Sequence, residues 1–268
     1  MDEGLKNAEV IQGDAKFIGP QTVRIGARTL TAPRIFINVG GRSVVPDLAG
    51  LSGVPYLDNA SIMELTEVSD HLVVVGGSYI GLEFAQMMRR FGAQVTVVER
   101  SEKLLSREDE DVSDGIRAIL EAEGVAFQLG AERLSLSRDA GRVVVGAVFG
   151  AESSAVVASH VLLAVGRRPN TDGLGLEAAG IKLDERGYIV ADEQLRTSPE
   201  GVWAVGACNG RGAFTHTAWN DHEIVAANLF DQDPRRVSDR IPCYALFIDP
   251  ALVSSGRVLQ DSRHRSDS

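Results

Sequence analysis

The sequence predicts an α/β protein, and three observations along residues 72–99 predict it. The first is an apolar run at 72–75 that ends in a cluster of glycines. The second is a stretch at 80–91 with apolar residues at helical spacing. The third is another apolar run at 94–98 that ends in Glu99. Strand, turn, helix and strand in this order are typical of a parallel sheet with crossover helices.

The glycine turn between the first strand and the helix suits a diphosphate. Gly76 permits a sharp turn, and Gly81 lets the helix lie close to the strand. Amides in the first turn of a helix have no intrahelical partner, and the helix dipole favours an anion beside them. Where backbone approaches phosphate most closely, Ser78 replaces glycine and adds both bulk and a hydroxyl donor. The expected phosphate contacts are Gly76, Gly77, Ser78, Tyr79, Ile80 and Gly81.

Glu99 lies eighteen residues after Gly81, where dinucleotide folds place an acceptor for the adenosine ribose hydroxyls. This combination favours a nicotinamide dinucleotide site over the alternative, in which the glycines only shape an ordinary crossover. Glu99 repels a 2′-phosphate, whereas the neighbouring Arg100 attracts one. We therefore expect NAD as the preferred cofactor, with NADP tolerated.

The composition excludes several classes of protein. The chain has 268 residues, of which 44% are hydrophobic, and a net charge of −10. This charge disfavours nonspecific binding to nucleic acid or to an anionic membrane. The apolar runs are too short to span a bilayer, and no basic segment leads into an apolar one at the N-terminus, so we expect a cytoplasmic protein. Cys208 and Cys243 form no redox or zinc motif and are expected to be reduced structural thiols, and no metal is expected.

Residues 8–71 contain mostly strand patterns. Runs at 8–12, 15–18 and 22–25, separated by glycines, suggest a small antiparallel meander. A buried strand is expected at 35–39, before Gly40 and Gly41, and residues 58–63 have the pattern of a capped short helix.

The second half of the chain alternates between helix and strand patterns. Ser106 and the acidic residues 108–111 resemble a capped helix start with a solvated acidic face, and Gly124 is the expected stop. Strands are expected at 125–128, 142–145 and 155–158, the last two as a hairpin. Further apolar strands at 161–165 and 202–205 end at Gly166 and Gly206. An amphipathic helix is expected at 215–230 and a disordered tail at 257–268.

Three buried strands, 35–39, 161–165 and 202–205, thus each deliver a glycine to the carboxyl edge of a sheet. Nucleotides bind outside such edges. With the turn at 76–81, these strands form four motifs whose order and spacing resemble the class I pyridine nucleotide-disulfide oxidoreductases, which depend on flavin. The chain is most similar to the branch with mercuric reductase and dihydrolipoamide dehydrogenase, and the resemblance covers about residues 8–250.

The resemblance implies a Rossmann-like nicotinamide-binding domain inserted in a partial FAD-binding domain. In this family, hydride passes from the nicotinamide to the flavin. By this analogy the chain divides into a partial FAD-binding domain at 1–55, an NAD(P)-binding domain at 56–169, a second FAD-binding part at 170–240, and a remnant of the dimerisation domain with a tail at 241–268.

The resemblance also implies roles for individual residues. Tyr79 matches the aromatic residue that covers the flavin and moves aside for nicotinamide, although a packed residue in a first helical turn explains it equally well. Glu83 matches a glutamate near the nicotinamide end, although the helix dipole also favours an acid there. The remaining implied cofactor contacts are Gly40, Gly41, Gly166, Gly206, Ala207 and Thr215. No catalytic acid, base or nucleophile is expected, and His216 and His222 fit surface or packing positions.

Three departures from the family pattern bear on function. The sequence has neither the family's glycine-rich flavin turn nor its CxxxxC pair, and it has Ala207 where an aspartate normally accepts from the flavin's ribityl chain. We expect a chain truncated at both ends, with weakened flavin affinity. The leading hypothesis is an NAD(P)H-dependent FAD-containing oxidoreductase. The alternatives are a non-catalytic NAD(H)-binding module, and half of a split enzyme that needs a partner chain. The protein partners left open are a second copy in a homodimer and a chain that carries the missing half. The electron acceptor is not encoded in any motif.

Overall fold

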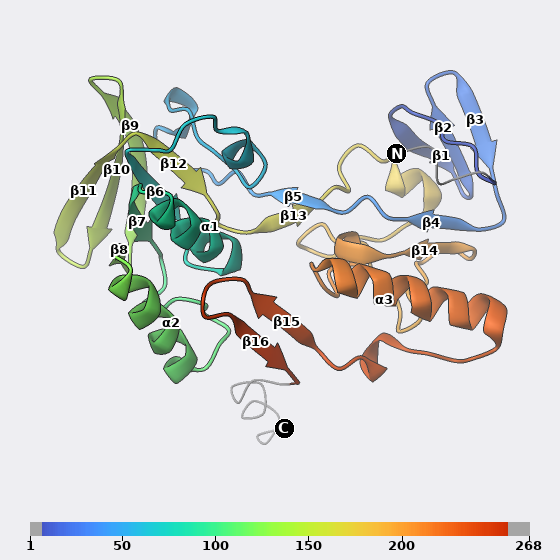
Figure 1. Cartoon of the computed structure of the whole chain (residues 1–268). Helices are drawn as coiled ribbons and strands as arrows, with labels where there is room; N and C mark the ends of the chain where they lie inside the picture. Colours follow the sequence, from blue (N-terminus) through green and yellow to red (C-terminus); the bar gives the residue numbers. More distant parts are fainter. Residues whose placement is uncertain (1–6, 257–268) are drawn as a thin grey trace. The chain divides into compact units, whose positions relative to one another are not determined.

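The computed structural model describes residues 7–256, which fold as two compact units (Figure 1). Unit 1 comprises residues 7–42 and 168–240, and unit 2 comprises 43–167 and 241–256. The described chain therefore begins in unit 1, enters unit 2 at residue 43, returns to unit 1 at residue 168, and enters unit 2 again at residue 241.

Unit 2 is built on a four-stranded parallel sheet. Its helices are α1 (Tyr79–Arg90) and α2 (Glu110–Ala122). In spatial order the strands are β12 (His160–Leu163), β6 (His71–Val75), β7 (Gln94–Val98) and β8 (Val125–Gln128). The chain runs from β6 outward to β8 and then crosses to β12 on the other side. The strand order reverses between β6 and β12, which is where open α/β sheets bind ligands.

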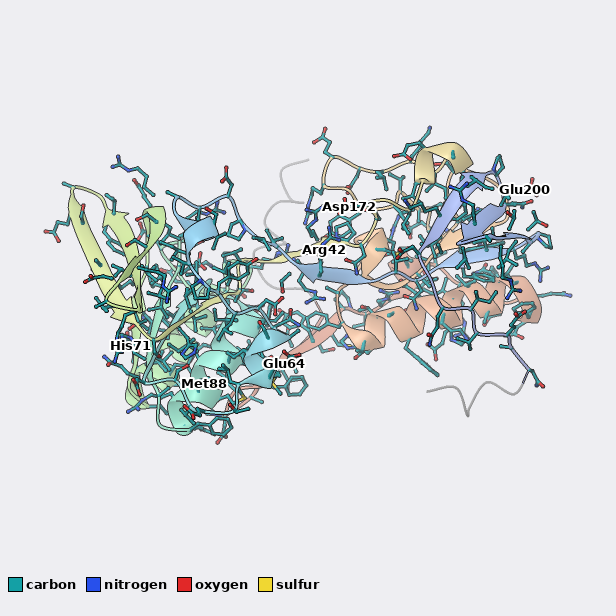
Figure 2. The ribbon with its side chains drawn as sticks, turned by 90° about the horizontal axis from the view of Figure 1, so that it is seen from above. Arg42, Glu64, His71, Met88, Asp172 and Glu200 are labelled. Carbon is teal, nitrogen blue, oxygen red and sulfur yellow. The ribbon has the colours of Figure 1, made fainter. Side chains whose placement is uncertain are left out.

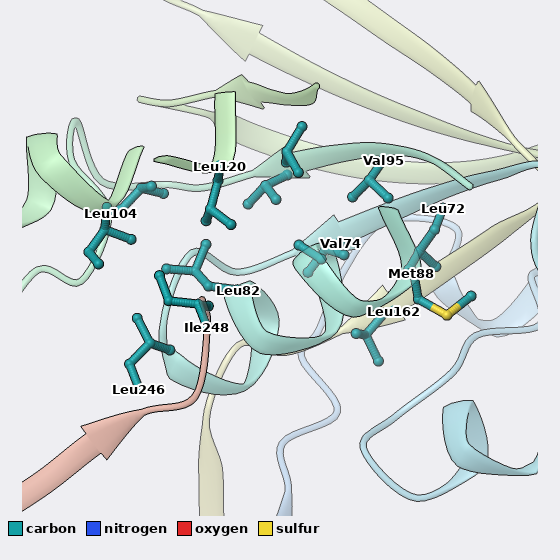
Figure 3. Close-up of a cluster of buried hydrophobic side chains, with 14 of the residues drawn as sticks. Leu72, Val74, Leu82, Met88, Val95, Leu104, Leu120, Leu162, Leu246 and Ile248 are labelled. Atoms are coloured by element: carbon teal, nitrogen blue, oxygen red, sulfur yellow. The ribbon is translucent and has the colours of Figure 1, made fainter. Parts of the chain in front are cut away.

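Both faces of this sheet are covered, which explains the continuous apolar run of β6. Leu72 and Val74 pack with Leu82 and Met88 of α1 in one cluster (Figure 3). The alternate residues of β6 face the other side, where a second cluster includes side chains of β10. Side chains of a strand alternate between faces, so a strand covered on both sides needs apolar residues at every position.

An antiparallel sheet covers the second face of the parallel sheet of unit 2. Its strands are β9 (Glu132–Asp139), β10 (Arg142–Phe149) and β11 (Glu152–Ala158), with β10 in the centre. The predicted hairpin at 142–145 and 155–158 is confirmed, with Val143 opposite Ala158. Strand β9 was not predicted, because most of its side chains are polar or half-exposed.

The end of the described chain also belongs to unit 2. Strands β15 (Cys243–Leu246) and β16 (Leu252–Ser255) form an antiparallel hairpin. Leu246 and Ile248 are buried in the same cluster as Leu82 and Leu104 (Figure 3). We call residues 243–255 the C-terminal hairpin.

Unit 1 combines an antiparallel sheet with a parallel strand pair. Strands β1 (Ala15–Gly19), β2 (Thr22–Ile25) and β3 (Arg28–Thr31) form the sheet. Strand β4 (Ile35–Ile37) pairs in parallel with β14 (Val202–Ala204), and α3 (Thr215–Ala226) follows. A π-helical turn at Ala227–Asp231 continues α3. Short strands β5 (Gly41–Ser43) and β13 (Arg167–Pro169) pair where the chain passes between the units.

Five short 3-10 helices complete the described chain. They are Leu51–Gly53, Ser61–Glu64, Leu176–Ala179, Gly206–Asn209 and Val237–Asp239. The helical start predicted at 58–63 is present as the second of these, and Asp58 accepts hydrogen bonds from the amides of Ala60 and Ser61.

The structure corrects the predicted meander. Residues 8–12 form no strand, and the third strand is Arg28–Thr31. Gly26 has a positive φ of 58°, and Ile25 pairs with Arg28. The chain therefore turns back at once through a two-residue hairpin, for which glycine is favoured.

The structure also corrects the acidic helix start. Helix α2 begins at Glu110, after an N-cap at Asp109 rather than Ser106. Glu108, expected on a solvated face, is only 2% exposed. The predicted helix at 215–230 ends its α-helical part at Ala226. The expected disordered tail at 257–268 lies outside the described residues.

Across residues 7–256, every helix is too short or too polar to cross a bilayer. The cytoplasmic location stays a prediction.

Candidate functional site

The glycine turn lies at the carboxyl end of β6, beside the end of β12. Gly76 has a φ of 115°, and a Cβ built on it would lie 2.5 Å from the carbonyl oxygen of Ala164. A Cβ on Gly81 would lie 2.2 Å from the carbonyl oxygen of Gly76. Real Cβ atoms do not approach backbone oxygens this closely. Both glycines are therefore needed to bring α1 and the end of β12 against the turn.

Helix α1 starts inside this turn. Ser78 is its N-cap, its side chain makes no capping hydrogen bond, and the residue is exposed. Tyr79 is the first helical residue, and Ile80 and Gly81 complete the turn. Amides at these first helical positions have no intrahelical acceptor, and the dipole adds partial positive charge. This arrangement fits one phosphate or diphosphate group.

Glu99 reaches back to the glycine turn from the end of β7. Its Oε2 accepts from the Gly77 amide at 2.6 Å, and its Oε1 accepts from the Ser101 amide at 2.8 Å. A carboxylate has about four acceptor positions, so Glu99 keeps capacity for ribose hydroxyls. The sequence predicted an acceptor here but not that the same carboxylate orders the turn. Arg100, the next residue, is exposed.

Tyr79 and Glu83 both contact the C-terminal hairpin region. The Tyr79 hydroxyl donates to Oε1 of Glu108 at 2.6 Å, and its ring meets that of Tyr244 edge-on at 5.6 Å. The Glu83 carboxylate accepts from the Phe247 amide at 2.9 Å. Sequence reasoning missed Glu108 and Tyr244, because Glu108 stands in a run of acidic residues that resembles a solvated helix start.

Both tyrosines stay protonated in this environment. Burial, reinforced by the Glu108 carboxylate, raises the pKa of Tyr79 far above its ordinary value. The same causes raise the pKa of Tyr244. The two hydroxyls are therefore O–H donors at neutral pH.

Gly166 follows β12, on the other side of the point where strand order reverses. Its φ is 131°, it is exposed, and its carbonyl accepts from the Val44 amide at 3.0 Å. The structure thus brings Gly166 and the glycine turn to the same edge of the parallel sheet.

In unit 1, Gly40 and Gly41 follow β4. Gly40 has a φ of 66°, and its carbonyl accepts from the Asn170 amide at 3.1 Å. A Cβ on Gly41 would lie 2.9 Å from the Arg168 carbonyl oxygen. Asp172 forms ion pairs with Arg42, both labelled in Figure 2, and with Arg168. Gly41 therefore allows close packing within the protein itself, whereas a Cβ on Gly40 would meet no atom within 4 Å and only its positive φ favours glycine.

Gly206 follows β14, and its amide is already bound. It donates to Oδ2 of Asp221 at 2.8 Å, and this oxygen also accepts from Asn209 at 2.8 Å. Asp221 is 2% exposed and forms an ion pair with Arg240. No pattern in the sequence singled out this buried carboxylate. Ala207 adds no polar side chain, and Thr215 is exposed at the start of α3.

Unit 1 therefore fits a flavin only incompletely. The Gly206 amide is engaged by Asp221, and position 207 supplies no acceptor. His216 and His222 are exposed on α3, as predicted. Both cysteines are free thiols; Cys208 is buried, which raises the pKa of its thiol, and Cys243 is exposed.

Comparison with known proteins identifies the family of the chain. The family model "Pyridine nucleotide-disulphide oxidoreductase" matches residues 4–221. The chain is 35% identical over 266 residues to "Probable pyridine nucleotide-disulfide oxidoreductase RclA" of Escherichia coli, covering 97% of this chain and 59% of that protein. It is 35% identical to the mercuric reductase of Streptomyces lividans, covering 92% of this chain and 53% of that one.

Solved structures give the same result. The copper(II) complex of the HOCl-induced flavoprotein disulfide reductase RclA from Escherichia coli superimposes with a TM-score of 0.89 at 34% identity, covering 98% of this chain and 60% of that one. The chain thus spans between half and three-fifths of the length of these relatives. The matching family model covers most of the chain, and the fold is that of flavoprotein disulfide reductases. The chain belongs to the pyridine nucleotide-disulphide oxidoreductase family.

Proposed function

We propose that this chain binds NAD(H) at the glycine turn of unit 2 and forms the nicotinamide-binding part of an NAD(P)H-dependent flavoprotein oxidoreductase. The observation that carries this proposal is the turn at 76–81. Two of its glycines have no room for a side chain, a helix starts within it, and Glu99 is bonded to its backbone. We assign unit 2 to the nicotinamide dinucleotide and unit 1 to part of the flavin-binding domain.

In this proposal the residues of the chain bind and orient, and the cofactor supplies the redox chemistry. A bound flavin would accept hydride from the nicotinamide. The first turn of α1 holds the diphosphate, and Glu99 accepts from the adenosine ribose. Tyr79 and Glu83 lie on the same helix, at and just after its start, and are assigned to the nicotinamide half.

The proposed preference is NAD, with NADP tolerated. Glu99 is held beside the turn, where a carboxylate repels a 2′-phosphate. Arg100 is exposed and able to offset part of this repulsion. Calorimetric titration of the purified chain with NADH and NADPH tests both points. We expect saturable binding of both, with the smaller dissociation constant for NADH. No heat signal with either would refute the proposed function.

A second candidate is a module that binds NAD(H) without turnover. The engaged Gly206 amide and the apolar Ala207 favour it, because both weaken flavin contacts. The absorption spectrum separates the two candidates. A yellow protein that NADH bleaches is an oxidoreductase, and a colourless protein that binds NADH is a module. If a colourless chain gained activity only with a flavin-carrying partner chain, it would be half of a split enzyme.

A further inference from the structure

The C-terminal hairpin lies along one face of α1. The helix residues that it contacts are spaced four, three and four apart, which is the spacing of a single helical face. Glu83 accepts from the Phe247 amide at 2.9 Å. Gln86 accepts from the Asp249 amide at 2.8 Å and donates to its carbonyl at 3.0 Å. The four helix residues are Tyr79, Glu83, Gln86 and Arg90.

Glu108 joins this face to the glycine turn. Its Oε1 accepts from the Tyr79 hydroxyl at 2.6 Å and from the Tyr244 hydroxyl at 2.6 Å. These lengths are typical of hydroxyl donors to a carboxylate. The Glu108 backbone carbonyl accepts from Lys103 at 2.7 Å, which fixes the loop that carries the side chain. One oxygen thus connects the helix start, the loop after β7 and the hairpin.

Stability alone is a poor explanation for this carboxylate. Glu108 is 2% exposed, and removing a carboxylate from water costs several kcal/mol. Apolar residues of similar volume often stabilise a protein equally well. What an apolar residue cannot do is fix two hydroxyls in one geometry. One of them belongs to the first residue of the helix that receives the diphosphate.

We propose that Glu108 is a positioning residue of the dinucleotide site. It holds Tyr79 and Tyr244 through one oxygen, and thereby couples dinucleotide binding at the start of α1 to docking of the C-terminal hairpin. Because such coupling is reciprocal, a bound dinucleotide must also tighten the hairpin. The inference rests on the proposed function and adds a residue from outside the glycine motif.

The experiment compares wild type with Glu108→Ala, Glu108→Gln and the matched control Glu110→Ala, which alters an exposed acid two residues away. Calorimetry gives the dissociation constant for NADH, and hydrogen exchange follows the amides of 244–249 with and without NADH. Wild type should show slower exchange on NADH addition. Glu108→Ala should weaken NADH binding about tenfold and abolish this protection. Glu108→Gln retains Oε1 as an acceptor for both hydroxyls and should keep most of the NADH affinity and most of the protection. Glu110→Ala should match wild type in both measurements.

The results that overturn the inference are specific. If Glu108→Ala lowers the melting temperature but binds NADH as wild type does, Glu108 is only structural. If Glu108→Gln behaves like Glu108→Ala, the accepting oxygen is not what matters. Should Glu108→Ala fail to fold, Tyr244→Phe removes the hydrogen bond of the hairpin to Glu108 while Tyr79 still donates to the carboxylate, and it should likewise weaken NADH binding and abolish the protection. Wild-type binding and protection in Tyr244→Phe would refute the coupling. If wild type itself does not bind NADH, the proposed function fails and this inference falls with it.

Discussion

The glycine-terminated strands of the two units differ in what surrounds them. In unit 2, the turn after β6 runs directly into a helix and is bonded to Glu99 from the next strand. In unit 1, Gly206 follows β14, but its amide is bound to Asp221 of α3. Gly76 and Gly206 both have a positive φ, but only the turn after β6 contains the start of an α-helix. The protein itself binds backbone groups of both turns, so what distinguishes the turn of unit 2 is the α-helix that starts within it.

The largest effect is expected from a substitution that disrupts the packing of the unit 2 turn. In Gly81→Ala, the new Cβ would lie 2.2 Å from the Gly76 carbonyl oxygen, so α1 must shift away from β6. We expect a loss of about 2–3 kcal/mol in the free energy of unfolding and the loss of NADH binding. Denaturant unfolding and calorimetry measure the two effects.

The matched control is Gly115→Ala. Gly115 is exposed within α2, and a Cβ there meets no atom within 4 Å. The same substitution should stabilise the protein by about 0.5–1 kcal/mol, because alanine favours a helix. If both variants were stabilised and bound NADH, the close approach of helix and strand would be irrelevant to the site.

The second prediction concerns the charge at the end of β7. Glu99→Gln removes the carboxylate that repels a 2′-phosphate and weakens the acceptor for the ribose. We expect about tenfold weaker NADH binding and a smaller loss for NADPH, so the preference for NADH shrinks. Asp114→Asn, on an exposed face of α2, removes the same charge away from the turn and should change neither. An unchanged ratio of the two dissociation constants would remove Glu99 from cofactor selection.

The third prediction concerns flavin binding in unit 1 and tests position 207. Ala207→Asp supplies the acceptor that the family pattern has next to Gly206. We expect several-fold more flavin per protein after purification or reconstitution with FAD, measured from the absorption spectrum. Ala207→Leu adds bulk without an acceptor and should not raise flavin content. Equal flavin content in all three proteins would show that position 207 does not limit flavin binding.

The smallest expected effect is a difference in acid sensitivity between the units. His71 in β6 bonds Thr96 at 2.9 Å, and burial lowers its pKa. A lowered pKa in the folded state means that the neutral form stabilises unit 2 above about pH 6.5 and that this stability is lost as the pH falls. Solvent still reaches the ring, so we expect less than about 1 kcal/mol.

Hydrogen exchange at pH 7.5 and at pH 5.5 measures the stability of each unit separately. Unit 2 should open more readily at the lower pH, whereas unit 1, whose His216 and His222 are exposed, should change less. His71→Gln should flatten the response of unit 2. A pH response that survives this substitution would assign it to other groups.

Local sequence determined most of the elements of unit 2 and the candidate turn. The run Leu72–Val75, the glycines that follow and the helical spacing to Phe91 each act over a few residues, so their pattern can be read directly. The same holds for Glu99, whose distance from Gly81 is fixed by one helix and one strand. Elements without such a pattern were missed, as β9 and β3 show. The former is largely polar, and the latter depended on a two-residue turn at Gly26.

What only the tertiary structure decided is which polar groups meet. Glu108 is indistinguishable in sequence from its acidic neighbours, yet its side chain alone enters the interior, because Tyr79 and Tyr244 bring two hydroxyls to it from positions 29 residues before and 136 residues after. Asp221 likewise reaches the Gly206 amide from another helix. Burial of a charge requires partners, and in this protein those partners come from distant parts of the chain. Periodicity and spacing in the sequence indicate which residues are neighbours along one helix or strand. They do not indicate contacts between side chains from distant parts of the chain.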